Sequence, residues 1–123
     1  MYLVGAEHPH KHETIAVLER LVSEKQKLVS NTEVLQEILH RYASIRRKEA
    51  IQPAFDALYG IIDNIFAITE ADVLAAKELV VAYAELSARD ATHVAQMRRL
   101  KIDTIFSFDK GFDLLGEFKR IPV

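Results

Sequence analysis

Residues 64–72 read Asn-Ile-Phe-Ala-Ile-Thr-Glu-Ala-Asp and carry the pattern on which the fold class of this chain depends. Residues 64–69 are mostly apolar and few in number, as in a buried strand. Thr69 and Asp72 stand three residues apart at the start of a long helical stretch, which is the spacing of a capping box. The segment therefore predicts a buried strand that leads directly into a helix from Glu70 to about Leu86.

The alternation of short apolar segments and longer amphipathic stretches continues in both directions along the chain. We predict further helices at residues 10–26, 32–47, 53–62 and from Ser87 onward, and further strands at residues 27–30, 103–108 and 118–123. Strands that alternate with helices in this way are typical of βαβ units, in which a parallel sheet is covered on both faces. No repeat or linker divides the sequence. The prediction is a single α/β domain over residues 1–123.

Composition excludes several classes of protein. The 16 Lys and Arg residues are balanced by 18 Asp and Glu residues, so the net charge of −2 provides no overall attraction for nucleic acid, and any RNA contact depends on a local basic patch. The chain has no Cys, which excludes disulfides and thiolate metal sites and favours a reducing compartment, the cytoplasm. Its apolar runs are far shorter than the roughly 20 residues of a membrane span.

The beginning of the sequence departs from the usual order of an α/β domain. Such a domain normally opens with a strand, because its first helix needs a sheet to pack on. Here the chain enters the helical stretch of residues 10–26 after only nine residues, and the pattern of residues 1–9 predicts no strand. We therefore expect the first strand to be missing from this sequence, which would expose two sheet edges.

Three carboxylates occupy positions that an α/β sheet would bring together. Glu37 lies in the second predicted helix, Asp90 opens the fifth, and Asp109 follows the predicted strand of residues 103–108; Asp113 is a possible fourth. Ligands of open parallel sheets bind beyond the carboxyl ends of the strands. Mg²⁺ and Mn²⁺ prefer oxygen ligands, so the pattern indicates a site for one or two such ions, which activate water for an in-line displacement at a phosphate.

Each acid also has an ordinary structural explanation. Asp90 with Ser87 has the spacing of a capping box, and Glu37 with Arg41 that of a surface ion pair within a helix. The Asp109–Gly111 segment is also compatible with a simple turn. From spacing alone, both the catalytic and the structural interpretations stay open.

Three segments taken in order resemble the later motifs of the PIN-domain family. They are Thr32-Glu-Val-Leu-Gln-Glu-Ile-Leu, Ser87-Ala-Arg-Asp-Ala-Thr-His-Val-Ala and Thr104-Ile-Phe-Ser-Phe-Asp-Lys-Gly-Phe-Asp. The resemblance covers nearly the whole chain and implies a three-layer fold with a short parallel sheet flanked by helices. It also implies a metal pocket formed by Glu37, Asp90 and Asp109, with Asp113 as a less certain match.

The resemblance further implies an activity and its partners. Small single-domain PIN proteins resemble VapC toxins, which are metal-dependent ribonucleases that a partner antitoxin holds inactive, often with an Arg near the acidic pocket, and which tend to dimerise. The family opens with a strand ending in an Asp-x-Asn motif, and Met1 falls just after that position, so we expect a native product longer by about ten residues, a strand and its turn. The alternative is a catalytically inactive PIN-like module that binds an antitoxin, RNA or its own copy.

Other polar residues are weaker candidates. Residues 46–48 and Arg98-Arg99 with Lys101 form basic clusters that either contact RNA phosphates or lie on a solvated face. His93 lies one turn after Asp90 and is a minor candidate for the pocket, because a helical His is more often a surface group or a satisfied core group.

Overall fold

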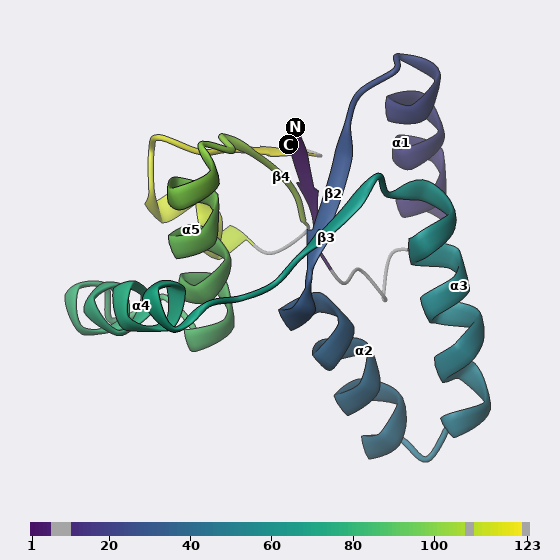
Figure 1. The fold of residues 1–123 in the computed structure, drawn as a ribbon, viewed down its shortest axis with the longest axis horizontal. Coiled ribbons are helices and arrows are strands. Elements are labelled where there is room, and N and C mark those ends of the chain that lie inside the picture. The colour runs from purple at the N-terminus through teal and green to yellow at the C-terminus, as the bar shows by residue number, and fades with distance from the viewer. Residues whose placement is uncertain (6–10, 108–109, 122–123) are drawn as a thin grey trace.

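A parallel sheet of five strands forms the centre of the molecule (Figure 1). The computed structural model describes residues 1–5, 11–107 and 110–121, with the side chains of the first helix described from residue 16 on. The strands are β1 (Tyr2–Val4), β2 (Leu28–Asn31), β3 (Asn64–Phe66), β4 (Thr104–Phe106) and β5 (Lys119–Ile121). Their order is β3-β2-β1-β4-β5, and each neighbouring pair is parallel. The predicted α/β class with a short parallel sheet is confirmed.

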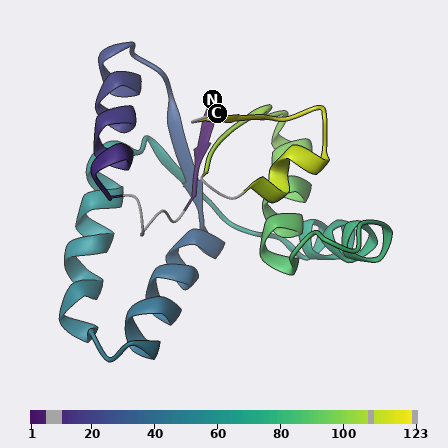
Figure 2. The same cartoon turned by 180° about the vertical axis from the view of Figure 1, so that it is seen from behind.

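Helices cover both faces of the sheet (Figures 1 and 2). On one side lie α1 (Lys11–Ser23), α2 (Thr32–Ser44), the 3₁₀ turn η1 (Lys48–Ala50) and α3 (Ile51–Ile61), and on the other lie α4 (Glu70–Ala82), α5 (Ala88–Leu100) and η2 (Lys110–Leu114). No helix within the described ranges has the length and apolar character that a membrane span requires.

Alternate strand residues fill two separate hydrophobic cores, as the period of a strand dictates. Leu3, Val29 and Ile105 join the core beneath α4 and α5, while Val4, Leu28 and Phe106 join the core beneath α1, α2 and α3. Because the central strands are buried on both faces, they are apolar almost throughout, which is the signature of a covered parallel sheet.

The beginning of the chain differs from the sequence-based expectation. Tyr2–Val4 form a strand at the centre of the sheet, between β2 and β4, although the pattern of residues 1–9 had predicted none. The physical reason is burial: Leu3 and Val4 are almost fully buried on opposite faces of the sheet, so three apolar residues suffice to fill this position. The two exposed sheet edges that we expected there are not formed.

Local helix signals in the sequence are largely confirmed. Thr69 and Asp72 make both hydrogen bonds of the capping box at the start of α4, and Asn31 caps α2. The ends are less well predicted: α4 ends at Ala82 and not near Leu86, because Tyr83 adopts an extended conformation and Leu86 turns into the core. Pro53 is the third residue of α3, where its missing N–H costs no helical hydrogen bond.

Candidate active site

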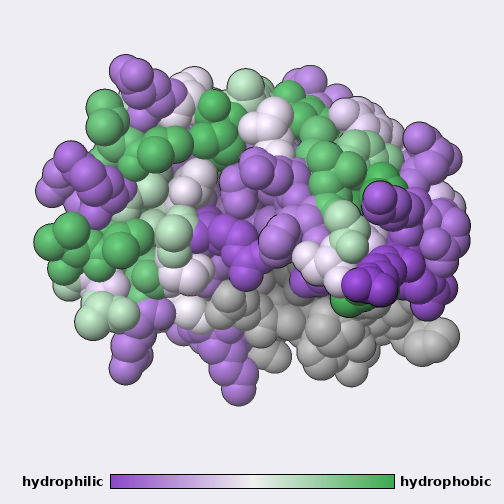
Figure 3. Space-filling model, turned by 90° about the horizontal axis from the view of Figure 1, so that it is seen from below, coloured by the Kyte–Doolittle hydropathy of each residue, from purple (hydrophilic) through white to green (hydrophobic). Residues whose placement is uncertain are grey.

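The carboxyl ends of the parallel strands lie along one edge of the sheet, where β2 leads into α2 and where α5 begins (Figure 1). Figure 3 looks from below onto this edge and shows a hydrophilic band at the centre, with hydrophobic areas to either side of it. In open parallel sheets this edge is the usual place of a ligand. We therefore describe its residues in the order in which the chain positions them.

Asn31 joins the sheet to the site because it is the last residue of β2 and the N-cap of α2. Its Oδ1 accepts a hydrogen bond from the backbone N–H of Val34 at 3.0 Å, as an N-cap side chain does. Its Nδ2 donates to Gln96 Oε1 at 2.8 Å and lies 2.9 Å from His93 Nδ1. Asn31 is fully buried, so all these bonds form away from solvent.

Glu37 lies one turn and a half into α2 and faces α5. Its Oε1 is 3.2 Å from His93 Nε2, and only 13% of its side chain is exposed. The His93 ring is also buried, with 4% of its side chain exposed, and it lies near the ring of Phe112, 6.4 Å between centroids. The structure therefore places His93, a minor candidate from the sequence, in direct contact with a predicted site residue. We call Asn31, Glu37, His93 and Gln96 the buried polar cluster.

Asp90 is the third residue of α5 and is also buried. Ser87 caps this helix, since its Oγ accepts the Asp90 backbone N–H at 3.1 Å, which is the Ser87 half of the predicted capping box. The first turn of a helix favours a negative charge because its free N–H groups carry positive partial charge. Asp90 and His93 are three residues apart and thus neighbours on one helix face, which brings the Asp90 side of α5 close to Glu37.

Glu33 is a further acid of this region that the sequence analysis did not select. Burial raises the pKa of Glu33 above its usual value, and the nearby Glu37 carboxylate raises it too, while His93 and Arg89 lower it. Glu33 therefore lies near enough to Glu37 for the two carboxylates to influence one another.

The remaining predicted acids belong to the C-terminal part of the chain. Asp109 lies outside the described residues. Asp113 is half-exposed and forms a two-pronged ion pair with Arg120, at 3.0 Å from Nε to Oδ1 and 3.2 Å from Nη2 to Oδ2. The hydrogen bond from Arg120 lowers the pKa of Asp113. Among the residues that the structure describes, no three His, Cys, Asp or Glu side chains are arranged to hold a metal ion.

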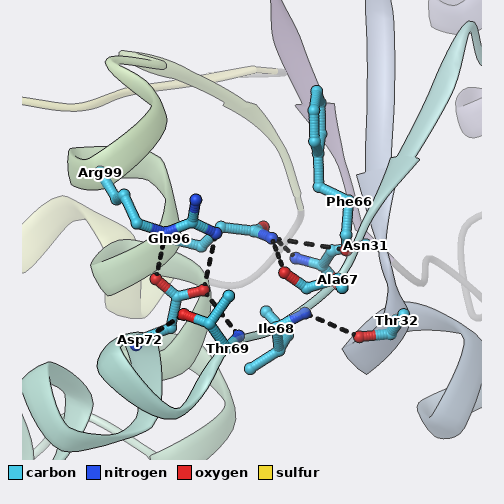
Figure 4. Close-up of polar contacts among 9 residues, drawn as sticks. All are labelled: Asn31, Thr32, Phe66, Ala67, Ile68, Thr69, Asp72, Gln96 and Arg99. Atoms are coloured by element: carbon cyan, nitrogen blue, oxygen red, sulfur yellow. Dashed lines mark hydrogen bonds and ion pairs between the residues drawn. The ribbon is translucent and has the colours of Figure 1, made fainter.

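A second set of contacts ties the polar edge to α4 (Figure 4). Gln96 Nε2 donates to the carbonyl oxygens of Phe66 and Ala67, at 3.4 and 3.3 Å, where the chain leaves β3. Arg99 binds both oxygens of the buried Asp72, at 2.7 and 3.0 Å. Burial alone would raise the pKa of Asp72, but the hydrogen bonds from Arg99 and Thr69 outweigh it and hold the pKa below its usual value.

The basic pair that the sequence analysis considered for RNA contact is largely engaged within the molecule. Arg99 pairs with Asp72, while Arg98 pairs with Glu117 and lies over the ring of Phe118, 6.0 Å from its centroid. In the first cluster, Arg47 pairs with the exposed Glu49. Arg98 and Arg99 thus join elements of the fold, whereas the exposed Arg47–Glu49 pair lies within a single turn. Both interpretations of the basic clusters, RNA contact and a solvated face, stay open.

Sequence reasoning selected neither Gln96 nor Asn31 as a site residue. One signal was present for each: Gln96 stands in the apolar run from Val94 to Met97, and Asn31 directly follows the apolar strand segment of residues 28–30. A polar amide among residues that must be buried indicates a buried hydrogen-bond partner. The partner itself, 62 or 65 residues away, is not readable from the local pattern.

Comparison with known proteins agrees with the fold described above. A family model described as the PIN domain matches residues 1–117. The chain belongs to the PIN-domain family. Within it, the chain is 50% identical over 121 residues to the ribonuclease VapC13 of Mycobacterium tuberculosis, with 98% of this chain and 92% of the relative covered. It is a PIN-domain ribonuclease of the VapC type, and the enzymes of this family depend on divalent metal ions.

Two solved structures of low sequence identity share the fold of this PIN-domain chain. VapC20 of M. tuberculosis, described as a Sarcin-Ricin loop cleaving toxin, has a TM-score of 0.76 and 22% identity, over 94% of this chain and 95% of that one. VapBC2 from Rickettsia felis, bound to a DNA fragment from its promoter, has a TM-score of 0.74 and 15% identity, over 97% and 96%. Five parallel strands between two helical layers are thus the PIN fold that the resemblance implied.

Proposed function

We propose that this VapC-type ribonuclease cleaves RNA phosphodiester bonds at a Mg²⁺ or Mn²⁺ site held by Glu37, Asp90 and Asp109, as the toxin of a toxin–antitoxin pair. The observation that carries the proposal is the burial of the two described carboxylates: Glu37 and Asp90 are both largely withdrawn from water at the edge where ligands bind. Within the described residues no Lys or Arg pairs with Glu37, whose partner is His93.

The donor set fits a hard divalent cation. Glu37 and Asp90 offer carboxylate oxygens, which Mg²⁺ and Mn²⁺ prefer, and Glu33 is a further acid near Glu37. Asp109 is the third ligand of the proposal by its place in the family motif. Asp113 is a fourth candidate that would have to give up the Arg120 ion pair in order to bind.

The residues of the chain divide the work of hydrolysis between them. A bound divalent cation supplies a water of lowered pKa and positive charge beside the phosphate. Glu37 and Asp90 would hold that cation through their oxygens, and His93 contacts the Glu37 carboxylate. The first turn of α5 keeps Asp90 in place through the Ser87 cap.

The exposed apolar residues support two proposed protein partners, an antitoxin and a second copy of the chain. Leu39 of α2, Ile45 directly after that helix and Tyr59 of α3 are about half exposed, and we assign this helix pair to the cognate antitoxin. The solved VapBC2 complex supports an antitoxin partner for this fold. Val73, Leu74, Val80 and Val81 are exposed on α4, and the hydrophobic area at the α4 end of Figure 3 supports their assignment to a homodimer contact. The absence of Cys favours the cytoplasm as the compartment.

The test is RNA cleavage by purified protein with Mg²⁺ or Mn²⁺ and a structured RNA. We expect Asp90→Asn and Glu37→Gln to lose cleavage, because each replaces a charged ligand by a neutral amide of the same shape. Glu78→Gln is the matched control, since Glu78 is an exposed acid on the outer surface of α4 and pairs only with Lys77 among the described residues. Equal cleavage by the wild type and Asp90→Asn would refute the catalytic assignment.

A further inference from the structure

The buried polar cluster contains hydrogen bonds that Glu37 would not need for metal binding alone. Asn31, His93 and Gln96 are almost fully inaccessible, and they link the start of α2, the middle of α5 and the exit of β3. Polar groups buried in this way stabilise a protein only when each donor meets an acceptor. That condition determines where each proton of the cluster lies.

The two amide groups are oriented by backbone groups that have only one role. The Val34 N–H is a donor, so the Asn31 atom facing it is the oxygen, and Nδ2 points the other way. The Phe66 and Ala67 carbonyls are acceptors, so the Gln96 atom facing them is the nitrogen. Gln96 therefore presents its oxygen to Asn31, as Figure 4 shows for these two side chains.

The orientation of Asn31 determines the tautomer of His93. One Nδ2 proton of Asn31 is used by Gln96 Oε1, and the other points at His93 Nδ1, 2.9 Å away. Nδ1 must accept this proton, and the ring proton of His93 consequently lies on Nε2. Nε2 faces Glu37 Oε1 at 3.2 Å and donates to it.

We propose that Asn31 and His93 are positioning residues of the active site, which hold the Glu37 carboxylate for the metal ion through a single tautomer of His93. The proposal rests on the proposed metal site. With Oε1 bound by His93, the other oxygen of Glu37 would be the one available to a cation. A ring with its proton on Nδ1 would instead turn a lone pair of Nε2 toward the carboxylate and repel it.

The effect of such support on metal sites is known in general. Hydrogen bonds that orient a ligand side chain typically change metal affinity or activity by about 10-fold to 100-fold when they are removed. The hydrogen bonds that orient His93 begin at Asn31, the last residue of β2. They therefore start on a rigid element of the fold, as precise sites require.

The first test determines the tautomer of His93 directly. In mildly alkaline buffer, where unperturbed imidazole rings carry one proton, ¹⁵N–¹H NMR distinguishes the two tautomers of each His. We expect His93 to have its proton on Nε2 in the wild type. In Asn31→Asp the second side-chain oxygen accepts where Nδ2 had donated, so we expect a proton on Nδ1. A wild-type His93 with its proton on Nδ1 would overturn the proposal.

The second test measures Mn²⁺ binding directly by electron paramagnetic resonance, without RNA. We expect His93→Leu and Asn31→Asp to bind Mn²⁺ about 10-fold to 100-fold more weakly than the wild type. His93→Gln is the conservative control, because its amide nitrogen can still donate to Glu37, and it should keep more affinity than His93→Leu. Urea unfolding of each variant shows whether a loss of Mn²⁺ binding is caused by a loss of the fold. If His93→Leu does not fold, the proposal is tested by His93→Gln, Asn31→Asp and the NMR result.

Glu37→Gln separates failure of this proposal from failure of the proposed site. If Glu37→Gln binds Mn²⁺ as tightly as the wild type, the metal site itself is wrong. If Glu37→Gln loses binding while the folded His93 and Asn31 variants match the wild type, the site stands and the positioning role is refuted.

Discussion

Replacing Gln96 by Glu tests whether the Gln96 amide points its nitrogen at the carbonyls of Phe66 and Ala67. The two side chains have nearly the same shape, and Gln96 is fully buried. Glu can still accept a proton from Asn31, but an ionised carboxylate would place an oxygen against the carbonyls of Phe66 and Ala67, at 3.3 to 3.4 Å. A protonated Glu could donate to one of those carbonyls, so the variant should fold with a proton that the unfolded chain does not carry.

The magnitude follows from linkage between protonation and folding. A Glu kept protonated in the folded state at pH 7, against an unfolded pKa of about 4.3, lowers the free energy of unfolding by about 2.7 times 1.36, or ~3.7 kcal/mol. Because the folded pKa is raised, the native state binds more protons than the unfolded state above pH ~4.3, and stability falls as the pH rises. The deficit should therefore shrink by about 2.7 kcal/mol between pH 7 and pH 5.

Urea unfolding of the wild type, Gln96→Glu and Gln96→Leu at both pH values measures this difference. Gln96→Leu is the matched control: it leaves one Asn31 N–H and two carbonyls without their Gln96 partner and should cost about 1–3 kcal/mol at either pH. A Gln96→Glu deficit that is equal at pH 5 and pH 7, or smaller than about 0.5 kcal/mol at pH 7, would refute the assigned orientation of Gln96.

Four further outcomes follow from the described contacts. Asp72→Asn removes a carboxylate with a lowered pKa, which stabilises the folded state at pH values above its usual pKa of 3.8 and loses this effect as the pH falls through its folded pKa. Urea unfolding should show a free energy of unfolding lower by about 1–2 kcal/mol near pH 7, with a smaller difference near pH 3. A difference that is the same at both pH values would contradict this prediction. Ser87→Ala removes the cap of α5 and should lower the free energy of unfolding by about 1 kcal/mol and the calorimetric Tm by about 3–5 °C; an unchanged Tm would show that the cap is dispensable. EDTA should stop RNA cleavage and Mn²⁺ restore it, whereas cleavage in EDTA would exclude metal dependence. Asp113→Asn should retain more cleavage than Asp90→Asn because Arg120 already binds Asp113, and equal losses would place Asp113 among the ligands.

Local signals account for the parts of the fold that the sequence predicted. The Thr69–Asp72 capping box and the Ser87 cap each involve residues three apart, and both form as expected. The alternation of apolar strand segments with amphipathic helices led to the correct α/β class, because burial on both faces imposes it on β2 and β4.

The position of β1 was not predictable from the same signals. Tyr2–Val4 are too few to show a period, and the following residues suggested a helix. Their strand pairs with residues 28–29 and 104–106, and only these distant partners make it the central strand. A short segment of this kind is assigned by tertiary packing, which overrides local pattern.

The candidate site divides in the same way. Glu37 and Asp90 were selected from motif spacing, and the structure brings the helices that carry them together at His93. The roles of Asn31 and Gln96 were not predicted, because their side chains meet across 65 residues of sequence. The partners of buried hydrogen bonds, unlike the apolar faces of helices and strands, produce no periodic pattern in the sequence.

The contacts of β2 explain why the cluster and the fold depend on one another. Ser30 donates to the Val4 carbonyl at 2.8 Å, which fixes β2 against β1, and Asn31 then turns the chain into α2 while its side chain orients His93 and Gln96. A shift of β2 by one residue would reverse the faces of its side chains and remove both functions at once. The register of this strand thus positions Asn31, which orients His93 against Glu37, so the support of the proposed metal site originates in the central sheet.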